Sequence, residues 1–109
     1  MAEQSPKITY TSTVLYRRTP SLEFNLEYYL AHHIPLCMRL WKPHGVLDCR
    51  VVETEPDQEY AYVVTMMWGD ESQYKKAFSQ KEEMKEIMGD VGKFTNGEPT
   101  FVVGRVVMG

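Results

Sequence analysis

One histidine lies in the middle of an apolar helical pattern, where its surroundings would strongly alter its chemistry. Segment 25–41 has helical spacing, and His33 stands near its centre. At about 100° per residue, the apolar residues on the same face are Leu26, Leu30, Cys37 and Leu40. An imidazole carried into an apolar interior changes its pKa and can then act as an acid, a base or a ligand. The alternative is a buried core histidine whose hydrogen bonds are satisfied.

Further side chains are candidates for a pocket around His33. Asp48 would orient the imidazole and raise its basicity if it faced the ring; otherwise it would face solvent or pair with Arg50 or Arg105. Tyr29 would stabilise developing oxyanion charge. The expected substrate-binding residues are Tyr16, Tyr29, Leu30, Cys37, Tyr62, Trp68 and, from a loop at the pocket mouth, His44. For the aromatic residues the alternative role is packing, and for His44 it is a solvated loop position.

The possible metal ligands are too few for a metal site. His32 projects about 100° away from His33, so the adjacent pair does not place two ligands on one face. His33 and Cys37 stand four residues apart and offer only two ligands. Cys37 and Cys49 lack a CxxC or zinc-type spacing, and we expect both in the core rather than in a disulfide. We therefore predict no metal.

The elements that would position these residues alternate between strands and helices. Asn25 is a good N-cap for the helix that carries His33, with Phe24 and Tyr29 at the two positions of a hydrophobic staple. Pro35 interrupts this helix, so we expect a kink or a loosened turn there. The predicted strands are 10–18, 46–53, 60–68 and 100–108, and the predicted helices are 25–41, 70–78 and 81–88, the last broken at Gly89.

Length and composition favour one folded domain, 1–109, with residues 1–8 as a flexible N-terminal segment. Apolar residues make up 43% and charged residues 25% of the chain, which is typical of a folded protein rather than a disordered one. The net charge of −3, without a basic patch, argues against nucleic-acid or membrane-surface partners. No stretch approaches the roughly 20 apolar residues of a membrane span, and the polar start does not resemble a signal peptide, so we expect a cytoplasmic protein.

The order of these elements is β-α-β-β-α-β, the ferredoxin-like split motif, in which helices cover one face of an antiparallel sheet. This order predicts an α+β fold. In segment 60–68, and again in Phe101, Val102 and Val103, apolar side chains point to both faces of the strand. A sheet that helices cover on one side must bury its second apolar face elsewhere. A homodimer that packs sheet against sheet is the simplest solution.

The helix around His33 also carries a family resemblance. The run Phe24-Asn25-Leu26-Glu27-Tyr28-Tyr29-Leu30, followed by His32-His33-Ile34-Pro35-Leu36, resembles the signature of the EthD family, named for ethyl tert-butyl ether degradation. Position 25 is Asn where members of that family often have Asp. The resemblance implies a dimeric α/β barrel, in which two ferredoxin-like protomers pair their sheets and each keeps a pocket between its sheet and its helices. His33 matches the family histidine.

Residues and resemblance together favour an enzyme that acts without a cofactor on a small, largely apolar carbonyl or phenolic compound, of the aromatic or polyketide kind. His33 would be the general acid or base of a lyase or isomerase that catalyses proton transfer, dehydration, decarboxylation or cyclisation. Two alternatives stay open. One is a monooxygenase, either cofactor-free or with haem held by His33 as an axial ligand. The other is a non-enzymatic protein that binds a ligand for an oxygenase system.

Overall fold

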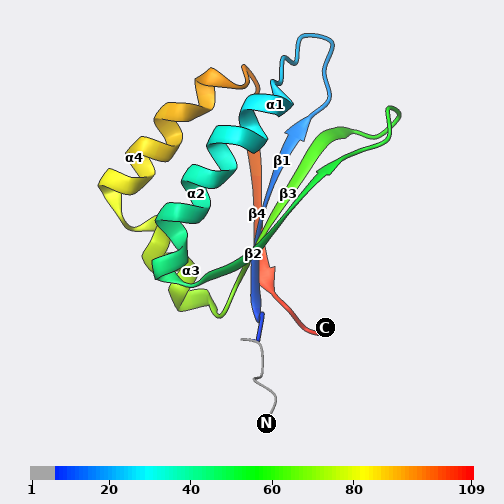
Figure 1. Ribbon diagram of the computed structural model, residues 1–109. Helices are drawn as coiled ribbons and strands as arrows, with labels where there is room; N and C mark the ends of the chain where they lie inside the picture. Colours follow the sequence, from blue (N-terminus) through cyan, green and yellow to red (C-terminus); the bar gives the residue numbers. More distant parts are fainter. Residues whose placement is uncertain (1–6) are drawn as a thin grey trace.

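A four-stranded antiparallel sheet forms one layer of the protein, as the computed structural model of residues 7–109 shows (Figure 1). The strands are β1 (Tyr10–Arg17), β2 (Val46–Glu53), β3 (Tyr60–Trp68) and β4 (Pro99–Arg105). Their order in the sheet is β2-β3-β1-β4, so β1 and β3 are central and β2 and β4 are edges. Of the segment 1–8 that we expect to be flexible, residues 1–6 lie outside the described residues.

The helices form the second layer, on one face of the sheet (Figure 1). They are α1 (Leu26–Tyr28), the π-helical turn η1 (Tyr29–His33), α2 (Ile34–Trp41), the 3₁₀ turn η2 (Lys42–His44), α3 (Glu71–Phe78), α4 (Lys81–Asp90) and the 3₁₀ turn η3 (Val91–Lys93). The predicted β-α-β-β-α-β order and the α+β, ferredoxin-like fold are confirmed. No helix within residues 7–109 has the length and apolar character needed to cross a membrane.

The first helical region widens just before Pro35. Asn25 caps its start, because its side-chain Oδ1 accepts a 3.0 Å hydrogen bond from the backbone N–H of Tyr28. At the end of η1 the N–H of Ile34 bonds to the carbonyl of Tyr29, five residues back instead of four. Pro35 has no N–H with which to continue an α-helical ladder, so the wider turn loses no hydrogen bond there. The loosened turn predicted from this proline is confirmed.

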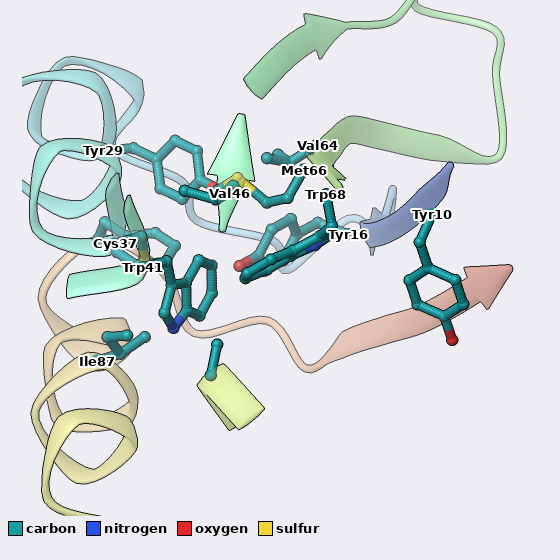
Figure 2. Close-up of a cluster of buried hydrophobic side chains, with 12 residues drawn as sticks. Tyr10, Tyr16, Tyr29, Cys37, Trp41, Val46, Val64, Met66, Trp68 and Ile87 are labelled. Atoms are coloured by element: carbon teal, nitrogen blue, oxygen red, sulfur yellow. The ribbon is translucent and has the colours of Figure 1, made fainter. Parts of the chain in front are cut away.

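The wide turn decides which side chains of this region face the sheet. The buried ones are Tyr29, His33, Cys37 and Trp41, each four residues after the last. Figure 2 shows Tyr29, Cys37 and Trp41 projecting toward side chains of the sheet. Leu30 turns outward instead and is 48% exposed. A uniform α-helix predicts Leu30 on the face of His33, and the π-helical turn makes that prediction wrong.

The second helical region starts at a strong cap and runs past Gly89. Asp70 caps α3 and shares a capping box with Gln73. Helix α4 then continues to Asp90, so the predicted break at Gly89 is wrong. Glycine costs roughly 1 kcal/mol in a helix interior, and the burial of Ile87 and the hydrogen bonds of Asp90 on either side of it stabilise the helical course.

The strands present one covered and one open face. Ser12, Val14 and Tyr16 of β1 lie on the helix side, and the register with the neighbouring strands extends this face across the sheet. The open face is formed by Thr11, Thr13, Leu15, Asp48, Arg50, Val52, Val63, Thr65, Met67, Thr100 and Val102. Apolar residues do lie on both faces, as predicted. On the open face, however, threonine side chains lie between the apolar ones.

Candidate active site

His33 is buried at the end of the π-helical turn, against the covered face of the sheet. Only 5% of the surface of His33 is exposed. The imidazole stacks on the ring of Tyr29, with 5.3 Å between the ring centroids and 20° between the planes. The ring of Phe94 lies 4.6 Å away, centroid to centroid. These aromatic neighbours restrict the orientation of the imidazole and shield it from solvent.

One ring nitrogen of His33 is bound to a carboxylate of α4. Its Nδ1 lies 2.9 Å from Oδ2 of Asp90, and Oδ1 of the same carboxylate accepts a 2.7 Å hydrogen bond from the hydroxyl of Tyr28. An ionised carboxylate only accepts hydrogen bonds, so Nδ1 of the neutral ring carries the proton and donates it. The lone pair on Nε2 is therefore available, and within residues 7–109 this nitrogen has no hydrogen-bond partner.

Burial and neighbouring charges set the protonation of this pair. Burial lowers the pKa of His33, and the adjacent carboxylate opposes this effect without reversing it. For Asp90, burial acts to raise the pKa, but the hydrogen bonds from Tyr28 and His33, with the charge of Lys93 at 3.8 Å, lower it more. At neutral pH the pair is a neutral imidazole beside an ionised carboxylate, which leaves His33 able to accept a proton.

A largely apolar cavity lies between the helices and the covered face of the sheet, with His33 in its wall. Its volume is about 50 Å³. Besides His33, the lining residues with a polar side-chain atom are Ser12, Tyr16, Tyr29, Cys37 and Trp41. Pockets for drug-sized ligands measure roughly 300–1,000 Å³, so this cavity accepts a small ligand or widens when a larger one binds.

Tyr16, Tyr29 and Cys37 are the predicted substrate-binding residues that the structure brings to the cavity with His33. Burial raises the pKa of Tyr16 to about 12 and also raises the pKa of Tyr29, so both hydroxyls keep their protons. Burial likewise raises the pKa of the Cys37 thiol to about 12. The tyrosines can therefore donate hydrogen bonds to a ligand, whereas Cys37 is an unreactive thiol at neutral pH.

Asp48 lies on the other side of the sheet. An irregularity in the pairing of β2 with β3, just before this residue, places it opposite Met67 on the open face. Its carboxylate lies 2.6 Å from the guanidinium of Arg50 and accepts a 2.8 Å hydrogen bond from the backbone N–H of Cys49. The prediction that Asp48 faces His33 is wrong, and the alternative pairing with Arg50 is confirmed.

Trp68 and Tyr62 are on the covered face but do not line the cavity. Trp68 is fully buried behind the cavity wall, where its indole nitrogen donates a 3.0 Å hydrogen bond to Oγ of Ser12. Tyr62 stacks on Phe24 near the other end of the strand, with 4.1 Å between the ring centroids, and its hydroxyl donates to Glu53. The register of β3 thus separates both residues from His33 along the strand.

His44 and Leu30 are also away from the cavity. Nε2 of His44 lies 2.9 Å from a carboxylate oxygen of Glu83, near the start of α4, whereas His33 meets the end of that helix. Because α2 and α4 run antiparallel, two histidines at opposite ends of one helical region meet opposite ends of the other. Leu30 points outward, as described above.

Asp90, which binds His33, and Tyr28, which binds Asp90, were not predicted from the sequence. Asp90 lies just past Gly89, where the helix was expected to stop. Glu83, Ile87 and Asp90 fall at helical spacing, so extending the helix by half a turn would have found it. Tyr28 belongs to the tyrosine pair of the family-like run, but helical geometry alone pointed to Tyr29.

This arrangement is suited to moving a proton within an apolar space. Within residues 7–109 no group of three or more His, Cys, Asp or Glu side chains could hold a metal ion. His33 offers a ring nitrogen of the kind that ligates haem iron, and the cavity of about 50 Å³ would have to widen far more for a haem macrocycle than for a single aromatic ring.

Comparison with known proteins identifies the fold. No protein-family model matches the chain, and no curated protein matches it. An EthD-like protein from Ralstonia eutropha JMP134 is similar in structure, with a TM-score of 0.79 and 17% identity over 94% of this chain and 95% of that one. A mutant form of SnoaB, a cofactor-independent oxygenase from Streptomyces nogalater, gives a TM-score of 0.60 and 14% identity over 96% of this chain and 97% of that one. A dimeric ferredoxin-like protein from an uncultured marine organism gives 0.57 and 11%, over 95% and 92%.

These likenesses extend over nearly the whole chain and define its class as the ferredoxin-like α+β fold. Within that class, the chain has the fold of EthD-like proteins. The resemblance predicted from the helix around His33 is thereby confirmed at the level of the fold.

Proposed function

We propose that this protein belongs to the EthD family and is an enzyme that transfers protons on a small aromatic or polyketide-like carbonyl compound without a cofactor. The observation that carries the proposal is the His33–Asp90 pair. The carboxylate fixes Nδ1 of the imidazole, and the unbonded Nε2 belongs to a ring in the wall of an apolar cavity. A neutral, oriented imidazole with a lowered pKa is a suitable general base near neutral pH.

The reaction would be that of a lyase or an isomerase. Nε2 of His33 removes a proton from the carbon next to a carbonyl, and the electron pair of that C–H bond moves onto the carbonyl oxygen. The hydroxyl of Tyr29 or Tyr16 stabilises this oxygen by a hydrogen bond, and Asp90 stabilises the imidazolium. The proton then returns to a different carbon in an isomerisation, or to a departing hydroxyl as water in a dehydration.

A second candidate is oxygenation without a cofactor, and the similarity to SnoaB favours it. Here Nε2 of His33 would deprotonate a phenol, and the electron-rich anion would be oxidised by dioxygen, which is itself reduced. The same residue is required in the same role. The two candidates differ in oxygen consumption, which an oxygen electrode measures with any phenolic compound that the protein converts.

We also propose that two copies pair through the open face of the sheet. Apolar side chains on this face include Val52 and Val102, which are 49% and 56% exposed. The dimeric ferredoxin-like neighbour supports this arrangement. Sedimentation equilibrium should give a dimer at micromolar concentration, and Val102→Lys, which places a charge in the proposed interface, should give a monomer. A monomeric parent protein would contradict the pairing.

The proposed reaction can be tested with acetophenone as the probe. In deuterated buffer, the protein should accelerate exchange of the methyl protons next to the carbonyl, as followed by proton NMR. His33→Gln should lower this acceleration by about 10²–10⁴-fold. His32→Gln is the matched control, because His32 is an exposed imidazole on the same turn, and it should leave the rate unchanged.

Two outcomes separate the alternatives. Binding of acetophenone without exchange would support a non-enzymatic ligand-binding protein. Equal exchange rates for the parent and His33→Gln would refute His33 as the base. Native mass spectrometry of the purified protein, with a visible spectrum of the same sample, identifies any molecule that the protein retains, including haem.

A further inference from the structure

Trp41 carries a buried hydrogen-bond donor that the fold does not use. The residue is 5% exposed, and among the described residues its indole Nε1 is a fully buried polar atom without a partner. The second tryptophan gives the contrast, because Nε1 of Trp68 donates to Oγ of Ser12 at 3.0 Å. Buried indole N–H groups usually find an acceptor, since leaving one unpaired costs free energy.

The surroundings of Trp41 explain why no side chain satisfies this donor. Its ring stacks on Phe78, with 5.0 Å between the ring centroids and 25° between the planes, and lies against Trp68. Figure 2 shows the indole nitrogen on the side of the ring where Ile87 lies. Ile87 and Phe78 line the same cavity as Trp41 and offer no acceptor. A trapped water needs two or more polar partners, and these neighbours provide none besides the indole.

Trp41 and the proposed base stand at separate positions along one helical region. Trp41 follows His33 by eight residues on the same buried stripe of the helix, which corresponds to about 12 Å along its axis. Both residues line one cavity. The other polar lining residues are Ser12, Tyr16, Tyr29 and Cys37, so Trp41 offers a donor two helical turns from His33. This placement matches a ligand with a reacting carbonyl at one end, an apolar body, and a second acceptor at the other end.

We infer that the Nε1–H of Trp41 is a ligand-binding group that donates a hydrogen bond to a second oxygen of the ligand, at the end remote from His33. The inference rests on the proposed function in one respect, namely that this cavity is the ligand site. It narrows the ligand class to elongated, apolar compounds with a hydrogen-bond acceptor at the end opposite the reacting carbonyl.

The cavity must widen to hold such a compound, and part of its wall is suited to this. Met84 and Met88 of α4 line it, and Met88 is 49% exposed. Methionine is unbranched and adapts its shape readily, so these side chains can move aside without disturbing the backbone.

A matched pair of probes tests the inference. Para-diacetylbenzene has a carbonyl at each end, whereas para-ethylacetophenone lacks one of them. In isotope-labelled protein, para-diacetylbenzene should move the indole N–H resonance of Trp41 downfield and leave that of Trp68, which is already bonded, in place. Para-ethylacetophenone should not produce this shift. The compound with two carbonyls should bind about three- to tenfold more tightly.

Variants separate this inference from the proposed reaction. Replacing Trp41 by benzothienylalanine keeps the bicyclic shape and removes the N–H, and it should make the two affinities equal; Trp41→Phe should do the same and assigns the resonance. His33→Gln should lose acetophenone exchange but keep the Trp41 shift. Equal affinities in the parent protein, an unmoved Trp41 resonance, or no binding of either probe would each refute the inference.

Discussion

Helix α4 makes two histidine–carboxylate contacts with the first helical region, and their differences are instructive. His33 and Asp90 meet at 2.9 Å, and so do His44 and Glu83. The side chains of the first pair are 7% and 11% exposed, and those of the second are 16% and 34% exposed. Only His33 lines the apolar cavity. The two pairs have the same contact distance, so what distinguishes His33, our proposed base, is its burial beside a space for a ligand.

The largest expected difference between the two pairs is in rate. Asp90→Asn should reduce the rate of acetophenone exchange about 10–100-fold, because the carboxylate orients the imidazole and stabilises its protonated form. The loss should fall on kcat rather than on KM, since Asp90 does not line the cavity. Glu83→Gln is the matched control and should keep the parent rate. Equal rates for these two variants would remove the distinction between the pairs.

The second difference is expected in the free energy of unfolding, because loss of the first pair should cost more than loss of the second. Asp90→Ala leaves the buried Nδ1 of His33 without an acceptor and removes the acceptor of the half-buried Tyr28 hydroxyl, so it should lower the free energy of unfolding by about 1–3 kcal/mol. Glu83→Ala should cost about 1 kcal/mol or less, because its pair is partly exposed. Urea denaturation measures both values. A larger loss for Glu83→Ala would contradict the comparison.

The dependence of stability on pH should follow His33. Burial lowers its pKa in the folded state, so below about pH 6.5 the unfolded chain binds the proton more readily and stability falls as the pH falls. The fall ends once the pH is below the folded pKa. His33→Gln should flatten this part of the curve, as unfolding in urea between pH 7 and pH 5 would show. An unchanged slope would mean that His33 has no lowered pKa.

The lowered pKa of Asp90 acts in a more acidic range. The contribution of Asp90 to the free energy of unfolding is complete above the ordinary carboxyl pKa of about 4. It is lost as the pH falls through the pKa of Asp90 in the folded state.

The smallest effect is expected at His44. His44→Gln should change stability by no more than about 1 kcal/mol and should not alter acetophenone exchange, because a partly exposed pair is weak and this one is outside the cavity. Any fall in exchange beyond about twofold, at unchanged stability, would connect His44 to the site after all.

Local patterns predicted the fold and the helix of His33 well. Strands β2 and β3 have the bounds read from their apolar and β-branched runs, and the N-caps Asn25 and Asp70 stand where their side chains indicated. The place of His33 on the buried stripe follows from the same periodicity. These features depend on neighbours in the sequence, so the sequence contains the information for them.

The partners of His33 depend on contacts between distant segments. Asp90 lies 57 residues away from His33 in the sequence, and it was missed because the helix was expected to end at Gly89. The face of Asp48 stayed open between His33 and Arg50 because the pairing irregularity before this residue cannot be read from strand alternation. Leu30 was misplaced by a turn that is one residue wider than an α-helix. At Asp48 and Leu30 the cause is a local shift by about one residue, with a large effect on where a side chain points.

The π-helical turn also has an evolutionary consequence. A π-helical turn holds about one residue more than an α-helical turn, so we expect deletion of a single residue within η1 to narrow this turn toward α-helical geometry. The two halves of the helical region would rotate relative to each other. The buried residues before the turn would then no longer lie on the same face as those after it. The gain or loss of one codon in this turn can thus change which side chains meet in the cavity without any change in the sequence of the sheet.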